Sequence, residues 1–234
     1  MSQIFTPKKI TSIEQLISDI HSHNINNSSR ELYLHGHIDA YEEEPGVDYR
    51  MATSFIKNVH ILQSQNNKNI LIHMHTIGGS WSDGMAIFNT IRLCKSPVTI
   101  LGYAQASSMS GIVLQAADKR ILMPDCELMI HHGSISLDDN TMAVKSAVDQ
   151  NEKSCKRMLQ VFAQRAVTGK YFKDRNYGIK KTMSYIDAKI KQSSDWYLTA
   201  EESVYYGFAD GIFGEKGFET ITKIRTGRKR TDFN

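Results

Sequence analysis

Apolar and polar positions follow two patterns along the chain, one typical of strands and one typical of helices. Short apolar runs rich in β-branched residues predict strands, and apolar residues spaced three or four positions apart predict the helices between them. The predicted strands cover residues 31–34, 70–75, 98–103, 120–123 and 128–131. The predicted helices cover residues 49–63, 82–94, 108–117, 141–168, 177–193 and 200–206. Strands that alternate with helices in this order predict a single α/β domain with a largely parallel sheet.

The two ends of the chain differ from this alternating core. Residues 12–20 have helical periodicity, and Ser12 stands where a helix N-cap is expected. Residues 21–29 are polar and are interpreted as a connector. Gly207 follows the last predicted helix and is expected to act as its C-terminal cap. We therefore divide the chain into a short helical N-terminal extension (1–29), a core domain (30–215) and a basic C-terminal tail (216–234).

Composition narrows the class of protein. Hydrophobic residues make up 41% of the 234 residues, yet no apolar run approaches the roughly 20 residues that a membrane-spanning helix needs. No apolar stretch follows Lys8 and Lys9, so we expect no secretory signal. Cys94, Cys126 and Cys155 lack metal-type spacing and are interpreted as reduced thiols. These features together predict a cytoplasmic protein that does not associate with membranes.

The formal net charge is only +3, and the excess of basic residues lies in the C-terminal tail. A solvated chain end is the simplest interpretation of this tail, with contact to nucleic acid or to an acidic partner as the alternative. The chain has no basic-aromatic stripe, zinc-type spacing or phosphate loop, so we expect no nucleic-acid partner. The basic residues that cluster in the tail include Lys223, Arg225, Arg228, Lys229 and Arg230.

Three serines lie where a predicted apolar strand runs into an apolar helix: Ser107, Ser108 and Ser110. The unpaired N–H groups and the dipole at a helix N-terminus favour negative charge, which suits the oxyanion of an acyl-transfer intermediate. Helix capping explains a serine at this place without any catalysis. The small residues around these serines leave room for a substrate.

His131 and His132 follow a short apolar strand and precede Gly133. A histidine at a strand end can serve as a general base, and the alternatives are a metal ligand or an exposed loop residue. Neighbouring residues of an extended segment point to opposite sides, so at most one of the two histidines faces a given site. No carboxylate or third histidine stands at ligand spacing, and we therefore expect no metal site.

Two further elements add candidate chemistry. Asp195 precedes a short apolar run and a helix start that carries the capping box Thr199–Glu202. By itself, Asp195 is interpreted as an ordinary loop carboxylate. Gly78 and Gly79 follow a predicted strand, where they form either a plain turn or a place at which a ligand approaches the backbone closely. A backbone N–H exposed there would be a candidate oxyanion donor.

Five short motifs resemble those of the ClpP family of self-compartmentalising serine peptidases, and they occur in family order from about residue 30 to residue 213. Residues 105–110 resemble Gln-Ala-Ala-Ser-Met-Gly, which selects Ser108 from its neighbours. Residues 123–131 resemble Leu-Pro-Asn-x-x-x-Met-Ile-His, which selects His131 over His132. The other motifs are residues 32–39, residues 75–79, and residues 195–202 followed by Tyr206, Gly207 and Asp210.

This resemblance implies a catalytic triad with Ser108 as nucleophile, His131 as base and Asp195 as the acid that orients the imidazole. It implies that the backbone N–H groups of Gly79 and Met109 form the oxyanion hole. The implied fold is the crotonase-like ββα spiral, and neither a metal nor another cofactor is implied.

Members of the family assemble into rings that enclose the active sites, and a ring-shaped AAA+ unfoldase feeds them. The resemblance therefore implies polypeptide substrates, a homo-oligomeric ring and an AAA+ unfoldase as partner. A cytoplasmic location is expected, with an organellar stroma or phage-infected cytoplasm as alternatives.

The chain also departs from the family pattern. Ile77 and Ser110 replace a proline and a glycine beside the expected site, residues 134–140 replace a glycine-rich strand, and extra residues rich in Lys and Tyr precede Asp195. These departures favour a divergent member of the family. The alternatives are a catalytically silent structural subunit, a phage-type maturation protease that acts on a capsid or scaffold protein, and an acyl-CoA enzyme of the same superfold.

Overall fold

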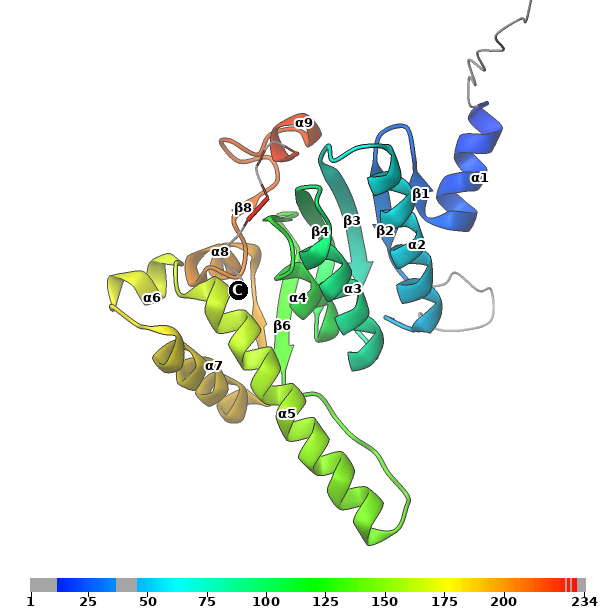
Figure 1. Cartoon of the computed structure of the whole chain (residues 1–234). Coiled ribbons are helices and arrows are strands. Elements are labelled where there is room, and N and C mark those ends of the chain that lie inside the picture. The colour runs from blue at the N-terminus through cyan, green and yellow to red at the C-terminus, as the bar shows by residue number, and fades with distance from the viewer. Residues whose placement is uncertain (1–11, 37–45, 226, 228, 231–234) are drawn as a thin grey trace, which may run out of the picture.

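A mostly parallel sheet forms the centre of the molecule (Figure 1). The computed structural model describes residues 12–36, 46–225, 227 and 229–230. Residues 1–11 of the N-terminal extension, residues 37–39 of the first motif and Arg228 of the tail lie outside the described residues. The sheet contains, in spatial order, β1 (Ile25–Asn26), β2 (Glu31–Leu34), β3 (Ile70–Thr76), β4 (Val98–Ser107), β5 (Lys119–Leu122) and β8 (Gly211–Ile212). The predicted α/β class with a largely parallel sheet is confirmed.

The sheet divides at β4, which is long enough to pair with two successive neighbours. Its first half, Thr99–Gly102, pairs in parallel with β5. Its second half, Gln105–Ser107, pairs in parallel with β6 (Glu127–His131). β6 pairs on its other side with the antiparallel strand β7 (Asp195–Leu198). The ends of β4 and β6 and the start of β7 therefore meet at one edge of the sheet.

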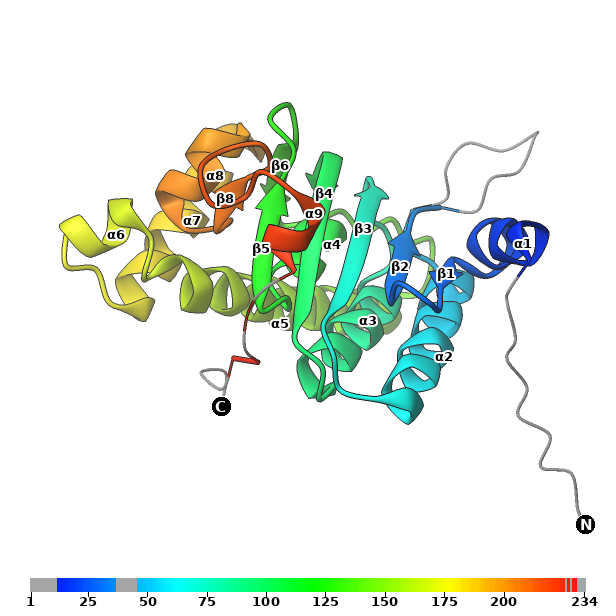
Figure 2. The same ribbon diagram turned by 90° about the horizontal axis from the view of Figure 1, so that it is seen from above.

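Helices cover the sheet and form a second group beyond β6 and β7. α2 and α3 lie on the same side of the sheet in both ribbon views (Figure 2), while α6, α7 and α8 gather beside β7. The helices are α1 (Ile13–His23), α2 (Tyr49–Gln65), α3 (Trp81–Leu93), α4 (Met109–Leu114), α5 (Thr141–Ala166), α6 (Lys170–Asp174), α7 (Ile179–Ser193), α8 (Ala200–Tyr206) and α9 (Ile221–Ile224).

Side chains of β3 are buried on both faces of the sheet. Ile70, Ile72 and Met74 pack into the main core, whereas Leu71 points to the opposite face. There it belongs to a second buried cluster that includes Ile224 of α9. Alternation along a strand sends successive side chains to opposite faces, and a strand covered on both faces needs an apolar residue at nearly every position. This explains why β3 begins with three consecutive apolar residues, Ile70, Leu71 and Ile72.

Several predicted helix ends agree with the structure. The Oγ of Ser12 accepts a hydrogen bond from the N–H of Gln15 and caps α1. Both hydrogen bonds of the Thr199–Glu202 capping box are present at the start of α8. Gly207 ends that helix in the left-handed conformation, with φ 81°.

Other predictions at the level of single elements are wrong. Residues 21–29 are not a simple connector, because α1 continues to His23 and Ile25–Asn26 forms the edge strand β1. Asp195 does not lie in a loop, since it begins β7. The helix predicted over 108–117 is limited to α4, Met109–Leu114. β1 and β7 have two and four residues, which is too short for a period of two to stand out in the sequence.

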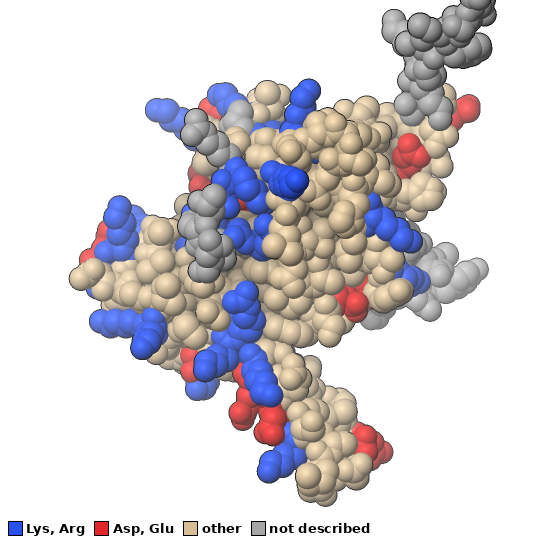
Figure 3. All heavy atoms as spheres, in the orientation of Figure 1, with Lys and Arg blue, Asp and Glu red and all other residues tan. Residues whose placement is uncertain are grey.

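Residues 170–194, named the insertion because they contain the extra residues before Asp195, form α6 and α7, which aromatic rings anchor to the core. The ring of Tyr171 in α6 lies 4.7 Å from that of Tyr206 in α8, and Tyr206 lies 5.2 Å from Trp196 in β7. Edge-to-face and tilted contacts at such distances stabilise a packed group of rings. The lysine-rich outer face of this region contributes to the basic side chains that gather over α5 and α6 in Figure 3. The insertion is therefore a packed part of the fold beside β7.

The C-terminal tail packs back onto the sheet. The Nη1 atom of Arg225 lies 3.0 Å from Glu31 Oε1 in β2. Lys229 Nζ lies 3.2 Å from Asp118 Oδ2, and the backbone N–H of Arg230 donates to Asp118 Oδ1 at 2.8 Å. The expectation of a solvated chain end is therefore wrong for these residues.

A buried ion pair joins β5 to the loop that follows α8. Arg120 is only 2% exposed and donates from Nη2 and Nε to the carboxylate of Asp210, at 2.5 and 3.1 Å. Burial alone would raise the pKa of Asp210, but the charge and hydrogen bonds of Arg120, with the charge of Arg165, lower that pKa to about 2. The pair fixes β5, the strand next to β4, to the loop after α8.

Within the described residues, no helix is both long and apolar enough to cross a membrane.

Candidate active site

Ser108 lies in the sharp turn at which β4 ends and α4 begins. Its backbone angles are φ 54° and ψ −123°, a combination that costs energy for any residue with a side chain. The turn is held because the N–H of Ser108 donates to the carbonyl of Met129 in β6, at 2.9 Å. A strained strand-to-helix turn of this kind exposes the hydroxyl of its central serine.

The two neighbouring serines are buried and lie outside the cavity beside Ser108. Ser110 is completely buried, and its Oγ lies 2.8 Å from the carbonyl oxygen of Thr76 and 2.7 Å from that of Ser107. Ser107 is 8% exposed and is the last residue of β4. Of the three serines, only Ser108 lines the cavity described below. The hydroxyl of Ser110 has acceptors within reach, which explains how a serine fits at this buried position.

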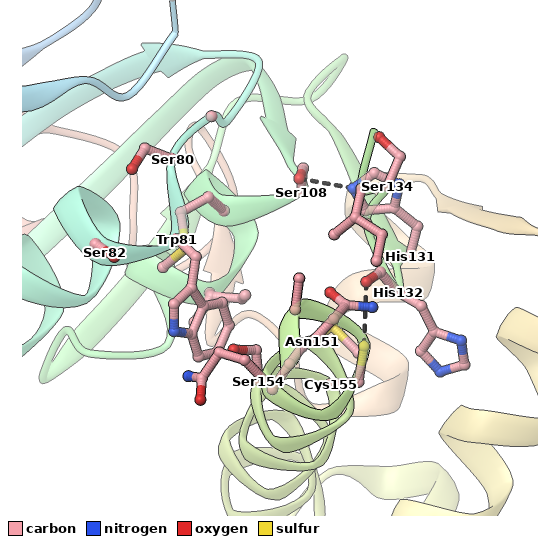
Figure 4. A pocket seen from close by; sticks show the side chains of 18 residues that line it. Ser80, Trp81, Ser82, Ser108, His131, His132, Ser134, Asn151, Ser154 and Cys155 are labelled. Atoms are coloured by element: carbon pink, nitrogen blue, oxygen red, sulfur yellow. Dashed lines mark hydrogen bonds between the residues drawn. The ribbon is translucent and has the colours of Figure 1, made fainter. Parts of the chain in front are cut away.

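The imidazole of His131 approaches the hydroxyl of Ser108, with 2.7 Å between Nε2 and Oγ (Figure 4). His131 is the last residue of β6, and β6 runs parallel to the end of β4, so the sheet itself brings the two residues together. His132 points away from Ser108 in Figure 4 and contacts Asp187 of α7, at 3.0 Å. The prediction that adjacent histidines face opposite sides is confirmed.

Asp195 lies on the other side of the same imidazole. It pairs with His131 in the register of β6 and β7, and its Oδ1 is 3.3 Å from His131 Nδ1. The side chains of His131 and Asp195 are 25% and 41% exposed. When Nδ1 carries the proton that faces the carboxylate, Nε2 is free to accept the proton of the Ser108 hydroxyl.

The glycine pair lies directly beside this group. Gly78 has φ 100°, and a Cβ atom on it would lie 2.8 Å from the backbone nitrogen of Met109 and from Ser108 Cβ. No larger residue fits there without moving the turn that carries Ser108.

The backbone N–H groups of Gly79 and Met109 take no part in the surrounding secondary structure. Val47 pairs with the glycine turn through the Gly78 carbonyl and the Ser80 N–H, which leaves the N–H of Gly79 out of that pairing. Met109 is the first residue of α4, and the N–H of a first helical residue has no acceptor within its helix. Met109 directly follows Ser108, and Gly79 lines the same cavity as Ser108, so both N–H groups are candidate oxyanion donors.

A cavity of about 620 Å³ opens beside Ser108 and His131. Apolar side chains from three helices form much of its wall, and polar groups of α5 lie at one side (Figure 4). Apart from Met109, none of these residues was predicted from the sequence to belong to the site, because they come from separate elements and helical periodicity marks them only as parts of a packed face. They include Trp81, Met109, Ile112, Met158, Asn151, Ser154 and Cys155.

Side chains that could bind a metal ion do not come together in the described part of the chain. There, no cluster of three or more His, Cys, Asp or Glu side chains is placed to hold a metal ion.

A hydroxyl, an imidazole and a carboxylate that contact one another in this order on an α/β fold are typical of serine hydrolases. The model of the Clp protease family matches residues 20–216 of the chain. The chain is 32% identical to the ATP-dependent Clp protease proteolytic subunit of Streptococcus gordonii, over 71% of this chain and 80% of that protein. The protein of the same description from Streptococcus equi is 30% identical, over 71% of this chain and 80% of that protein. The one from Deinococcus radiodurans is 27% identical, over 72% of this chain and 77% of that protein. The chain belongs to the Clp protease family, and it is therefore a peptidase of the serine type.

Proposed function

We propose that this protein is a serine endopeptidase whose catalytic triad consists of Ser108, His131 and Asp195. The observation that carries the proposal is the continuous line of contacts from the hydroxyl to the imidazole, at 2.7 Å, and from the imidazole to the carboxylate, at 3.3 Å. The strained backbone of Ser108 supports it, because strain of this kind gathers at functional sites.

In the proposed mechanism, His131 Nε2 accepts the proton of Ser108 Oγ while Oγ attacks the carbonyl carbon of the scissile peptide bond. The resulting imidazolium is stabilised by Asp195 and then donates its proton to the leaving amine. Breakage of the C–N bond leaves an acyl-enzyme ester on Ser108. Water, deprotonated by His131, attacks this ester; as the ester C–O bond breaks, His131 returns the proton to Ser108 Oγ and the carboxylic acid product leaves.

The negative oxygen of the tetrahedral intermediates needs hydrogen-bond donors that are already in position. We assign this role to the N–H groups of Gly79 and Met109, which flank Ser108 and are not used by the adjoining secondary structure. Loss of one such donor typically lowers the rate by about 100- to 1,000-fold. The apolar wall of the adjacent cavity would accept an apolar side chain of the polypeptide substrate.

The proposal extends to assembly. The curated relatives are described as proteolytic subunits of an ATP-dependent protease, and we propose a homo-oligomeric ring supplied by an AAA+ unfoldase, located in the cytoplasm. The first half of α5 and the segment before it contain no buried residue from 133 to 150, and apolar side chains there are exposed. Contacts between copies of the chain would cover them. In this assignment residues 30–215 form the peptidase domain.

A peptide cleavage assay on wild type and Ser108→Ala tests the function. We expect the wild-type protein to cleave short fluorogenic peptides and Ser108→Ala to lose roughly 10⁴- to 10⁶-fold in kcat, because no nucleophile remains. Ser134→Ala is the matched control, since Ser134 lines the same cavity without contacting His131 Nε2.

Native mass measurement on the same samples separates a failed assembly from a failed active site. Assembled wild-type protein that cleaves no peptide would contradict the proposal and favour a structural subunit. Full activity in Ser108→Ala would contradict the assignment of the nucleophile.

A further inference from the structure

Helix α7 leads directly to the residue proposed to orient the catalytic imidazole. It ends at Ser193, and Ser194 then turns the chain with φ 67° into β7, whose first residue is Asp195. The N–H of Ser194 donates to the carbonyl of Ile190 at 2.7 Å, which fixes this turn to the helix. α7 also packs along α5, so its position is set by the body of the protein.

The same helix contacts the strand that carries His131. Asp187, in the middle of α7, lies 3.0 Å from Nε2 of His132, the residue after His131. Lys191, one turn further along α7, lies 2.7 Å from the other carboxylate oxygen of Asp187 and holds it in place. A second contact comes from α5, where the thiol of Cys155 donates to the carbonyl of His132 at 3.2 Å (Figure 4).

These contacts fall at one end of the β6–β7 ladder. The pair His131 and Asp195 is the last one in the register, and residues 132–140 beyond it form neither strand nor helix. The end of a ladder opens more readily than its middle, because it has neighbours on one side only. His132, the first residue beyond this last pair, is held by contacts from both α5 and α7.

We propose that Asp187 is a positioning residue for the peptidase reaction, acting through His132 to hold the end of β6 so that His131 stays within reach of Ser108. This inference rests on the proposed function. Asp187 touches neither Ser108 nor His131 Nε2, so its effect is on geometry. The segment of α6 and α7 thus reaches the site twice, through the turn before Asp195 and through the contact with His132.

The test compares Asp187→Ala with Asp174→Ala. Alanine favours helix, so neither change disturbs the fold of its helix. Asp174 is matched because it also pairs with a lysine four residues away in the same insertion, at 2.6 Å, but contacts no residue of the site. We expect Asp187→Ala to lower kcat and the rate of acylation by a fluorophosphonate roughly 10-fold, which is less than the roughly 100-fold that a misplacement of 1 Å can cost. KM should stay within about two-fold, and Asp174→Ala should match wild type in both rates.

A double-mutant cycle of Asp187→Ala with His132→Asn tests whether Asp187 acts through His132. If Asp187 acts through His132, each single variant lowers the acylation rate similarly and the double variant is no slower than either one. Asp187→Glu, which keeps the carboxylate, should recover part of the rate.

Three results would overturn the inference: a wild-type rate in Asp187→Ala, additive losses in the cycle, or rates that follow only the thermal unfolding midpoints of the variants. Failure of the proposed function itself is recognised separately, because wild type would then not react with the fluorophosphonate at Ser108.

Discussion

Replacing His131 with asparagine is expected to lower the kcat of peptide cleavage by roughly 10⁴- to 10⁶-fold, the loss seen when the base of a serine peptidase triad is removed. Asparagine cannot accept the proton of the serine hydroxyl, and His131 Nε2 is the group that lies 2.7 Å from Ser108 Oγ. Asp195 contacts the far nitrogen of the same ring and cannot replace it. Steady-state kinetics with a fluorogenic peptide measure the loss.

His132→Asn is the matched control, because it makes the same change one residue further along the chain. His132 faces Asp187, so its loss affects only the geometry at the end of β6. The expected decrease is roughly 10-fold, small beside that of His131→Asn. If His132→Asn were the more damaging of the two variants, the roles assigned to the adjacent histidines would be reversed.

Replacing Asp210 with alanine is expected to have the largest effect on stability, lowering the free energy of unfolding by about 3 kcal/mol. Breaking a buried ion pair by removing one partner costs about 3–5 kcal/mol, since the other charge is left buried and uncompensated. The lower end applies because 28% of the Asp210 side chain is exposed, although Arg120 is 3% exposed. Urea unfolding at a fixed protein concentration measures the change, and Asp174→Ala, which affects an exposed pair, should leave stability nearly unchanged.

The contribution of Asp210 depends on pH in a defined direction. Its pKa is lowered from 3.8 to about 2, so the folded state favours the ionised carboxylate. The resulting stability is fully present above about pH 4 and is lost as pH falls towards about 2. The difference in unfolding free energy between wild type and Asp210→Asn should therefore narrow over this interval. A difference that stayed constant from pH 5 to pH 2 would contradict the assigned pKa.

The sequence predicted the long, strongly periodic elements of the fold and missed the short ones. β3 and α2 bury regular apolar positions, and their limits were predicted to within a few residues. β8 and α9 contain two and four residues, and pairing or packing with distant segments is what orders them. Tertiary contacts of this kind leave no local pattern in the sequence.

The candidate site was predicted in a different way. From the residues alone, each of the three had an alternative to a catalytic role. Ser108 could be a helix cap, His131 a loop residue or metal ligand, and Asp195 an ordinary loop carboxylate. Only the resemblance of several motifs in family order selected the three together, and the structure places them in contact. The contact between His132 and Asp187 could not be predicted, because the two residues are far apart in sequence and belong to no shared motif.

The most direct measurement is the labelling of the purified wild-type protein with a fluorophosphonate, followed by mass spectrometry of its peptides to locate the modified residue. An activated serine reacts with this reagent, whereas an ordinary hydroxyl does not. The proposed function predicts a single label per chain on Ser108, and no label in His131→Asn. A label on another serine, or an assembled wild-type protein that does not react, would contradict it.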